Sequence, residues 1–405
     1  MKTDTAPLPD LSSLTLEQKA AQLLMIDIPD TAMTEDTRRH LSETAWNGVI
    51  LFAKNVQSRQ QVVELVEAIH EASPIRPWIS VDQEGGLVDR FRFPEMSLSP
   101  GLMALGAAGD PELTCQAHRI MGDELADLGI GIDFAPCLDV NVNPQNPIIG
   151  ARSFGEDPER VARLGQAAIR GLRDGGVASC AKHFPGHGDT SLDSHMALPV
   201  VPHDRARLEQ VELKPFQAAV DAGVEAIMTA HIVFPAFDPT PGLPATLSHP
   251  ILTGLLREKM GYDGVIVTDS LSMKAIADHY GMGEAAVRSV EAGADLVLAL
   301  GTLEDQKQAF QALLAAVRQG RLSEARLDRS LQRLFALKRK FPGRASRRHT
   351  FDAQAHQELM GRIAAASITL VKNDGVLPLS TGNILVLSPD LLPLTPLGEV
   401  SATAS

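Results

Sequence analysis

The sequence predicts an α/β protein built on a (β/α)8 barrel of the TIM type, followed by a C-terminal extension. The chain has 405 residues, which suits one large barrel with an appendage, or two to three ordinary domains. Hydrophobic residues make up 44% and charged residues 21% of it, as in globular proteins and unlike disordered chains or coiled coils. Apolar runs rich in Val, Ile and Leu alternate with segments of helical period, which is typical of a parallel sheet covered by helices.

Eight apolar runs follow one another in the first 300 residues, and each fits one strand. They cover residues 23–28, 48–53, 78–82, 132–140, 178–183, 226–231, 264–269 and 295–300. Strands of a parallel sheet are buried on both faces, so they read as continuous apolar runs. Eight of them match a barrel whose usual length of roughly 250 residues can exceed 400 with insertions. A doubly wound open sheet is the alternative.

Helix start signals support the segments between the strands. Ser58, Asp110 and Asp157 each stand before a helical period, where a side-chain oxygen can cap the first N–H groups. Pro follows both aspartates, as suits the first position of a helix. The last barrel helix is expected over residues 323–340, with Leu at helical spacing on one side.

The chain after residue 340 changes character. Residues 341–352 are rich in Pro, Gly and Arg, which favours a linker. One helix over 353–366 and a strand over 383–388 follow, too little to bury a core of their own. We therefore expect a catalytic barrel over 1–340, a linker over 341–352, and an incomplete segment over 353–405 that resembles the start of an α/β second domain.

Charge and cysteine content exclude several classes of protein. The balance of 37 Lys and Arg against 50 Asp and Glu gives a net charge of -13, which would repel a phosphate backbone, so nucleic acid is not an expected partner. No apolar run approaches the ~20 residues that cross a bilayer, and no apolar core follows Lys2. We expect no membrane partner and no signal peptide. Cys115, Cys137 and Cys180 lack metal or redox spacing, and a cytoplasmic location fits them best.

Polar residues gather where the predicted strands end. They are Asp82, Asp139, Asn141, Lys182, His183, His231 and Asp269. In a (β/α)8 barrel the loops after the strands converge at one face and carry the catalytic groups. A single residue of this kind can equally be a salt bridge or a helix cap, but the whole set predicts a catalytic site at that face.

The segment KHFPGHGDTSLDSH over residues 182–195 is the richest in chemistry. One interpretation is a metal site, with His183, His187, Asp189 and His195 as its ligands. The other is an acid/base pair in which Asp193 orients His195. Gly186 and Gly188 favour the acid/base pair, because a flexible loop suits a rigid metal cage poorly.

Two further stretches supply carboxylates. Asp269 ends a buried apolar strand, where a carboxylate is costly unless it is paired or used, and it is a candidate nucleophile or the cap of the next helix. Asp82 and Glu84 precede a glycine pair and Arg90. A carboxylate and a guanidinium side by side suit the recognition of hydroxyls, which both donate and accept hydrogen bonds.

These residues fall within motifs that resemble a known family. The motifs are DQEGG (82–86), ARSFGEDP (151–158), KHFPGHG (182–188) with DSH (193–195), PATLS (244–248) and VTDSLSM (267–273). In this order they resemble glycoside hydrolase family 3, and within it the bacterial β-N-acetylglucosaminidases that trim cell-wall fragments. The resemblance covers about residues 14–340.

The resemblance implies a role for each motif residue. Asp269 is then the nucleophile, His195 the general acid/base and Asp193 its partner. The residues around the sugar are Asp82, Arg90, Arg152, Lys182 and His183. The DSH motif separates N-acetylglucosaminidases from β-glucosidases, which generally take a Glu from a second domain. Leu87 departs from the Arg that members often carry after the glycine pair, and we expect this to loosen that edge of the pocket.

The implied reaction is hydrolysis with retention through a covalent glycosyl-aspartate, without metal or organic cofactor. A β-N-acetylglucosaminide phosphorylase is an alternative, because a histidine acid/base does not repel phosphate as a carboxylate would. A broader β-glucosidase, a sugar-binding protein without turnover and a metal-dependent hydrolase are the others.

Overall fold

A computed structural model describes residues 8–192, 198–343, 352–375 and 377–379 of the chain. Eight parallel strands form one sheet in the order β7-β6-β5-β4-β3-β2-β1-β8. They are β1 Leu24–Asp27, β2 Gly48–Leu51, β3 Trp78–Val81, β4 Ile132–Asp133, β5 Ala178–Phe184, β6 Ala226–Thr229, β7 Val265–Val267 and β8 Val297–Leu298. A bridge between Val267 and Leu296 brings β7 against the strand that leads into β8. The predicted barrel is therefore confirmed, and the doubly wound order is wrong.

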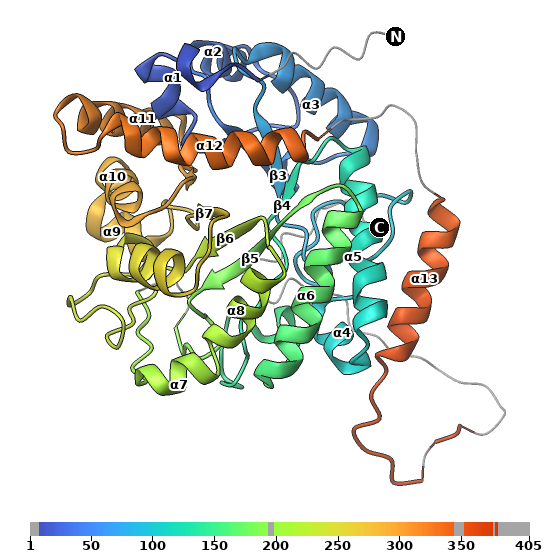
Figure 1. Ribbon diagram of the computed structural model, residues 1–405. Coiled ribbons are helices and arrows are strands. Elements are labelled where there is room, and N and C mark those ends of the chain that lie inside the picture. The colour runs from blue at the N-terminus through green and yellow to red at the C-terminus, as the bar shows by residue number, and fades with distance from the viewer. Residues whose placement is uncertain (1–7, 193–197, 344–351, 376, 380–405) are drawn as a thin grey trace.

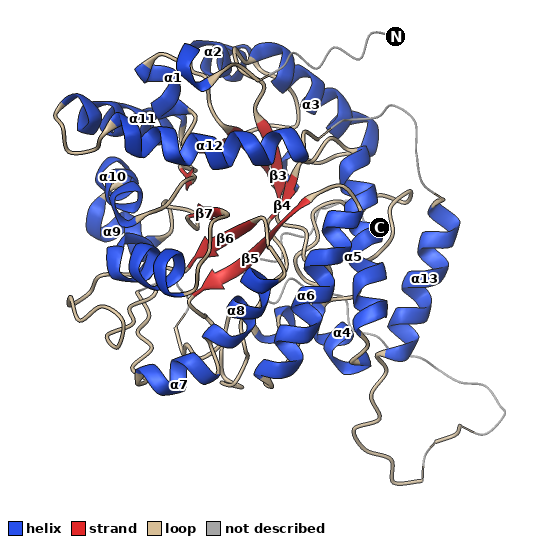
Figure 2. Ribbon diagram, viewed as in Figure 1, coloured by secondary structure: helices blue, strands red, loops and turns tan. Residues whose placement is uncertain are grey.

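Helices surround the strands (Figures 1 and 2). They are α1 Leu16–Ala21, α2 Glu35–Glu43, α3 Arg59–Ala72, α4 Leu102–Ala108, α5 Pro111–Asp127, α6 Pro158–Asp174, α7 Arg205–Gln210, α8 Leu213–Asp221, α9 Lys274–Tyr280, α10 Met282–Ala292, α11 Leu303–Arg318, α12 Glu324–Lys340 and α13 Ala353–Ala366, with a π-helix at Pro250–Lys259. Ser58, Asp110 and Asp157 cap α3, α5 and α6 as the sequence predicts, each side chain accepting from a backbone N–H of the first turn.

Seven of the eight observed strands are shorter than the predicted runs, mainly at their carboxyl ends, whereas β5 extends one residue further, to Phe184. β4 stops at Asp133, although residues up to 140 were expected to continue it. Pro136 has no N–H to donate, but the chain still follows β5, because Cys180 donates to the Ala135 carbonyl at 2.8 Å and Leu138 to the Lys182 carbonyl at 2.7 Å. Polar residues beyond the ladder thus stay beside their neighbouring strands at the mouth of the barrel.

The amino-terminal end of the barrel is closed by α12, which crosses it (Figure 1). Trp78, the first residue of β3, donates from Nε1 to the carbonyl of Phe341 at 2.8 Å. Lys338 donates from Nζ to the carbonyl of Asn47, just before β2, at 2.8 Å. All eight strands are buried along their length, so the interior is a packed core, as in other barrels of this kind.

The chain after the barrel adds α13, which lies beside α5 (Figure 1). Met360 and Ile363 are buried on it, and His356 Nδ1 lies 3.1 Å from Glu124 Oε1 on α5. The helix therefore packs on the barrel. The domain boundaries stay a prediction, and the strand expected over 383–388 lies outside the described residues. Within the described part, no helix combines the length and apolarity that crossing a bilayer requires.

Candidate active site

A cavity of about 350 Å³ opens at the carboxyl-terminal ends of the strands. Its volume lies within the usual range of small-molecule pockets. The wall takes side chains from β1, β2, β3, β5, β6, β7 and β8 or the residues just after them. Six predicted site residues line it together, namely Asp82, Arg90, Arg152, Lys182, His183 and Asp269. These six residues, spread over 188 positions of the sequence from 82 to 269, therefore meet at the face where the sequence predicts the site.

A cluster of four charged residues forms one wall. Lys182 Nζ lies 2.7 Å from Asp82 Oδ1 and 2.6 Å from Glu84 Oε1. Arg152 pairs with Glu84 through two bonds, Nη2 to Oε1 at 2.7 Å and Nε to Oε2 at 2.9 Å. Such a bidentate pair fixes both side chains. The sequence marks Glu84 only as a partner of Asp82 in hydroxyl recognition, whereas its oxygens hold two cations in the structure.

Electrostatics favours the charged forms of Glu84 and Lys182 in this cluster. Burial by itself raises the pKa of Glu84, but the charges of Arg152 and Lys182 outweigh it and hold that pKa well below its usual range. Burial lowers the pKa of Lys182, yet Asp82 and Glu84 raise it above its usual value. Asp82 is the most open member, with 19% of its side chain exposed. Its carboxylate is therefore the acceptor that the cluster presents to the cavity.

Asp139 forms a hydrogen bond with the ring of His183. The Nδ1 atom of His183 lies 2.7 Å from Asp139 Oδ2, while the His187 amide donates to Oδ1 at 2.6 Å. Burial raises the pKa of Asp139, but the facing charge of His183 and further hydrogen bonds bring it down to about 2. An ionised carboxylate only accepts, so Nδ1 carries the hydrogen of this pair. Asp139 thereby fixes the ring orientation of a residue that lines the cavity.

Asp269 stands two residues after β7 on the cavity wall. The Ser270 amide donates to its Oδ1 at 2.7 Å. A carboxylate after a barrel strand, held by a backbone N–H and lining the same cavity as the charged cluster, suits a nucleophile that attacks a bound electrophile. The alternative role, a cap for the next helix, is not seen, because α9 begins at Lys274 after Met273 and its N-cap makes no side-chain bond.

Residues 15–337 match the family described as Glycosyl hydrolase family 3 N terminal domain. The chain belongs to glycoside hydrolase family 3. It is 40% identical over 378 residues to Beta-hexosaminidase A of Pseudoalteromonas piscicida, covering 86% of this chain and 63% of that protein. The chain thus spans less than two thirds of that relative's length.

Other family 3 members are similar over most of the chain. A Beta-hexosaminidase of Thiobacillus denitrificans is 37% identical over 281 residues, covering 68% of this chain and 77% of that protein. The solved structure of a glycoside hydrolase family 3 beta-N-acetylglucosaminidase from Paenibacillus sp. str. FPU-7 is 49% identical, with a TM-score of 0.86, covering 90% of this chain and 70% of that one. The family and the barrel that the motifs imply are confirmed.

The predicted acid/base pair, Asp193 and His195, lies outside the described residues of this family 3 barrel. The rest of that loop is placed, and its polar residues have separate partners. His187 Nδ1 lies 2.9 Å from Thr190 Oγ1, and Asp189 Oδ2 lies 2.6 Å from His203 Nε2. Burial, followed by the charge of His183, lowers the pKa of His187 to about 4.

The described part of the expected metal set does not converge on one point, since His183, His187 and Asp189 each face a different partner. Among the described residues another group could hold a metal, because ligand atoms of Cys137, Asp139 and His183 lie within 4.8 Å of one another. The Cys137 thiol donates to Asp139 Oδ2 at 3.1 Å. Hydrogen bonds within the group therefore account for its geometry.

A further group of residues on the cavity wall, around Asp27, was not predicted from the sequence. Asp27, at the end of β1, accepts from Lys54 Nζ at 2.7 Å and from the Gly301 amide at 2.9 Å. Lys54 and Arg90 both approach the ring of Phe52, at 5.7 and 6.0 Å from its centroid. Asp27 is the last residue of β1 and stands one residue before the end of the run predicted over 23–28, so a search for polar residues near strand ends could have found it.

Leu87, the departure from the family pattern, lies at the edge of this region. It is 44% exposed. The residues that line the cavity from this stretch are Val88 and Arg90. The Leu87 side chain is thus partly exposed and does not line the cavity, whereas Arg90 does.

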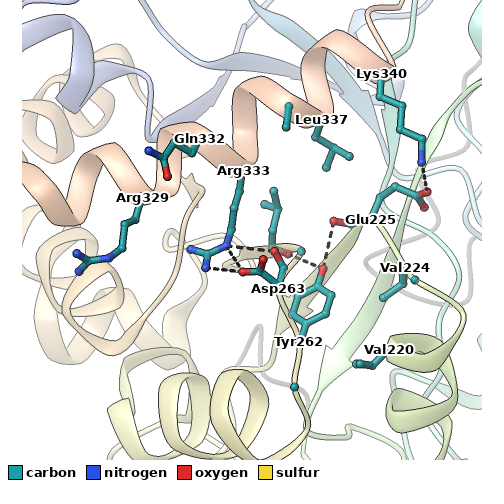
Figure 3. A pocket seen from close by; sticks show the side chains of 15 residues that line it. Val220, Val224, Glu225, Tyr262, Asp263, Arg329, Gln332, Arg333, Leu337 and Lys340 are labelled. Carbon is teal, nitrogen blue, oxygen red and sulfur yellow. Dashed lines mark hydrogen bonds and ion pairs between the residues drawn. The ribbon is translucent and has the colours of Figure 1, made fainter. Parts of the chain in front are cut away.

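A second and larger cavity, of about 650 Å³, lies at the amino-terminal ends of β6 and β7. Figure 3 shows its wall between α12 and the residues before these strands. Arg333 pairs there with Asp263 at 2.7 Å and Lys340 with Glu225 at 3.5 Å, and Tyr262 donates to the Glu225 carbonyl at 3.1 Å. This end of a barrel serves stability rather than catalysis, so size alone does not locate the site.

Proposed function

We propose that this family 3 chain is a retaining β-N-acetylglucosaminidase that removes a terminal, non-reducing N-acetylglucosamine from β-glycosides. The cavity carries the proposal, because Asp269 and the Asp82–Lys182–Glu84–Arg152 cluster line one pocket at the carboxyl ends of the strands. The names of the relatives support the sugar. Fragments of bacterial cell wall are the natural substrate class we infer. A cytoplasmic location accords with free cysteines that are all buried.

In the proposed mechanism, Asp82, Arg90, Arg152, Lys182 and His183 bind the sugar and exclude other orientations. Asp269 attacks the anomeric carbon and forms a glycosyl ester, while His195 gives its proton to the leaving oxygen. His195 then takes a proton from water, which breaks the ester and restores Asp269. Retention in two such steps requires nucleophile and acid/base roughly 5 to 5.5 Å apart. No metal or organic cofactor takes part.

The first test compares aryl β-N-acetylglucosaminide with aryl β-glucoside as substrates. We expect turnover of the first and little of the second. The variant Asp269→Asn should lose turnover, because an amide cannot form the ester, whereas Asp263→Asn, at the other end of β7, should keep it. A preference for the glucoside would overturn the sugar. Formation of sugar 1-phosphate at the expense of free sugar in phosphate buffer would point to a phosphorylase.

The second test concerns His195. General acid catalysis contributes about 10²- to 10⁴-fold when the leaving group is poor, but dinitrophenolate leaves unaided. His195→Ala should therefore slow cleavage of a disaccharide far more than that of a dinitrophenyl glycoside. A burst should appear with the latter, because the intermediate still needs a base for hydrolysis. Asp193→Asn should behave in the same way, more mildly. Equal losses without a burst would remove His195 from this role.

A further inference from the structure

The segment that carries Asp269 lies at the seam of the barrel. β7 pairs with β6 over three residues, whereas an isolated bridge, Val267 to Leu296, connects it to the β8 side. Asp269 and the residues after it lie beyond both ladders. Regular strand pairing therefore does not hold this segment, and other contacts must fix it.

One peptide unit of this segment is held from both sides. The carbonyl of Ser270 accepts from His231 Nε2 at 2.9 Å. The N–H of the same unit, from Leu271, donates to the Leu298 carbonyl at 3.1 Å. The Ser270–Leu271 peptide is thus fixed between the end of β6, through a side chain, and β8, through the backbone.

The neighbouring peptide unit reaches the proposed nucleophile. The Ser270 amide donates to Asp269 Oδ1 at 2.7 Å. Ser270 stands between the two peptide units, so its backbone dihedral angles connect them. The side chain of His231 therefore acts on the orientation of the Asp269 carboxylate through a single residue.

His231 is itself rigidly oriented. It is 1% exposed, and its Nδ1 lies 2.8 Å from Oγ1 of Thr246. Thr246 is fully buried in the 3-10 turn Ala245–Leu247, and its hydroxyl also contacts Thr229 at 2.8 Å. A carbonyl oxygen only accepts, so Nε2 carries a hydrogen that points to the Ser270 carbonyl. Thr246 is the central residue of the PATLS motif, which the cavity wall does not include.

We propose that His231 is a positioning residue for the nucleophile, and that PATLS acts through Thr246 by orienting His231. This proposal rests on the proposed function, with Asp269 as nucleophile. His231 holds the Ser270 peptide so that Asp269 faces the anomeric carbon in both chemical steps. A displacement of 1 Å at the reacting atoms costs about 10²-fold in rate, so loss of this contact lowers kcat and leaves ground-state binding unchanged.

The experiment compares His231→Phe, which keeps a ring without a donor, with His231→Gln, which keeps a side-chain N–H. Thr246→Val removes the hydroxyl at nearly constant shape. Each is assayed with aryl β-N-acetylglucosaminide for kcat and KM, with N-acetylglucosamine as a competitive inhibitor, and by thermal unfolding. We expect kcat to fall about 10²-fold in His231→Phe, to recover about tenfold in His231→Gln, and to fall less in Thr246→Val. The inhibition constant should stay within about threefold throughout.

A kcat of His231→Phe within about threefold of wild type would overturn the proposal. So would a parallel loss of kcat and inhibitor binding with no recovery in His231→Gln, which indicates a merely structural role. If His231→Phe does not fold, an unchanged kcat in Thr246→Val would overturn it equally. Asp269→Asn is measured alongside as a control. If Asp269→Asn is active, the proposed function itself is contradicted. If Asp269→Asn is inactive while the His231 variants have normal kcat, only the present proposal is contradicted.

Discussion

Both ends of the barrel bury a cluster of ion pairs, but only one cluster opens onto a site. At the carboxyl end, two carboxylates, Asp82 and Glu84, face two cations, Lys182 and Arg152. Because Asp82 is partly exposed to the cavity, the cluster has an acceptor left for a ligand. A buried ionic cluster therefore suggests a functional site when its carboxylate reaches a cavity at the carboxyl ends of the strands.

In the amino-terminal cluster the central carboxylate is enclosed, and the member that lines the second cavity is a cation, Arg333. Asp295 is fully buried and pairs with Arg257, Arg326 and Arg333, and its oxygens also accept from Ser330 Oγ at 2.6 Å and the Ile266 amide at 3.0 Å. Burial lowers the pKa of Arg257 and of Arg326, while Asp295 opposes that shift. One carboxylate thus compensates three guanidinium groups, and its role is to stabilise the fold.

The largest effect should come from breaking the carboxyl-end cluster. Lys182→Met removes the cation between Asp82 and Glu84, and truncating one partner of a buried charge pair at a binding site costs roughly 2 to 5 kcal/mol. We expect kcat/KM on aryl β-N-acetylglucosaminide to fall at least about 10²-fold. Lys340→Met, which breaks the Glu225 pair at the other end, is the matched control and should change kcat/KM by less than about threefold. A similar loss in both variants would contradict the functional difference between the two ends.

The corresponding change at the amino end should affect stability instead. Asp295→Asn removes the carboxylate that pairs with Arg257 and Arg326, while Arg333 keeps its pair with Asp263. Breaking a buried pair in this way costs about 3 to 5 kcal/mol. We expect Tm to fall by roughly 10 °C, with kcat/KM at 20 °C within about threefold of wild type. Loss of activity in a protein that unfolds at the wild-type temperature would show that this end takes part in catalysis.

Lys338 tests the role of the amino end through the pH dependence of the free energy of unfolding. It is a buried cation at the amino end, and burial followed by the charge of Arg76 lowers its pKa to about 7. The unfolded chain, with an ordinary pKa of 10.5, binds this proton more tightly between pH 7 and 10.5. We compare the free energy of unfolding of wild type with that of Lys338→Met. The difference, wild type minus variant, should rise with pH between 7 and 10.5, by up to about 1.4 kcal/mol per pH unit. Below pH 7 it should be constant. Urea unfolding at several pH values measures it, and a flat difference would contradict the shift.

The smallest effect should come from Asp263, which pairs with Arg333 at the surface and has 89% of its side chain exposed. Exposed pairs contribute about 0 to 1 kcal/mol. Asp263→Ala should therefore leave urea unfolding within about 1 kcal/mol of wild type and kcat/KM unchanged. A cost as large as that of Asp295→Asn would mean that the outer pair, and not the buried carboxylate, stabilises this end.

The strands and the face of the site were predictable, because apolar runs and the residues that end them are local features of the sequence. Asp82, Lys182 and Asp269 were found in this way. The partners of Glu84 were not predictable in this way, since Arg152 follows no strand and lies 68 positions from Glu84 in the sequence. The same holds for His231, which the sequence marks only as a strand-end residue. Its contacts to Thr246 and Ser270 depend on how three separate segments pack.

The shortness of β4 and β7 was also beyond the sequence. Residues 134–140 are as apolar as a strand, and only the bond pattern around Pro136 shows that they follow β5 without a continuous ladder. The amino-terminal cluster was missed because Arg257, Arg326 and Arg333 lie on helical segments whose charges look solvent-exposed in sequence. They pair with Asp295 only in the folded barrel, where α12 crosses its end.

The most direct measurement is to trap the covalent intermediate with a fluorinated N-acetylglucosaminyl fluoride and locate the label by peptide mapping. We expect one sugar per chain on the peptide that contains Asp269, and none in Asp269→Asn, while Asp263→Asn labels as wild type does. Two results would contradict the assignment of the carboxyl-end cavity and its Asp269 as the catalytic centre. One is a label on Asp82 or Glu84. The other is turnover of the aryl β-N-acetylglucosaminide without any label at Asp269.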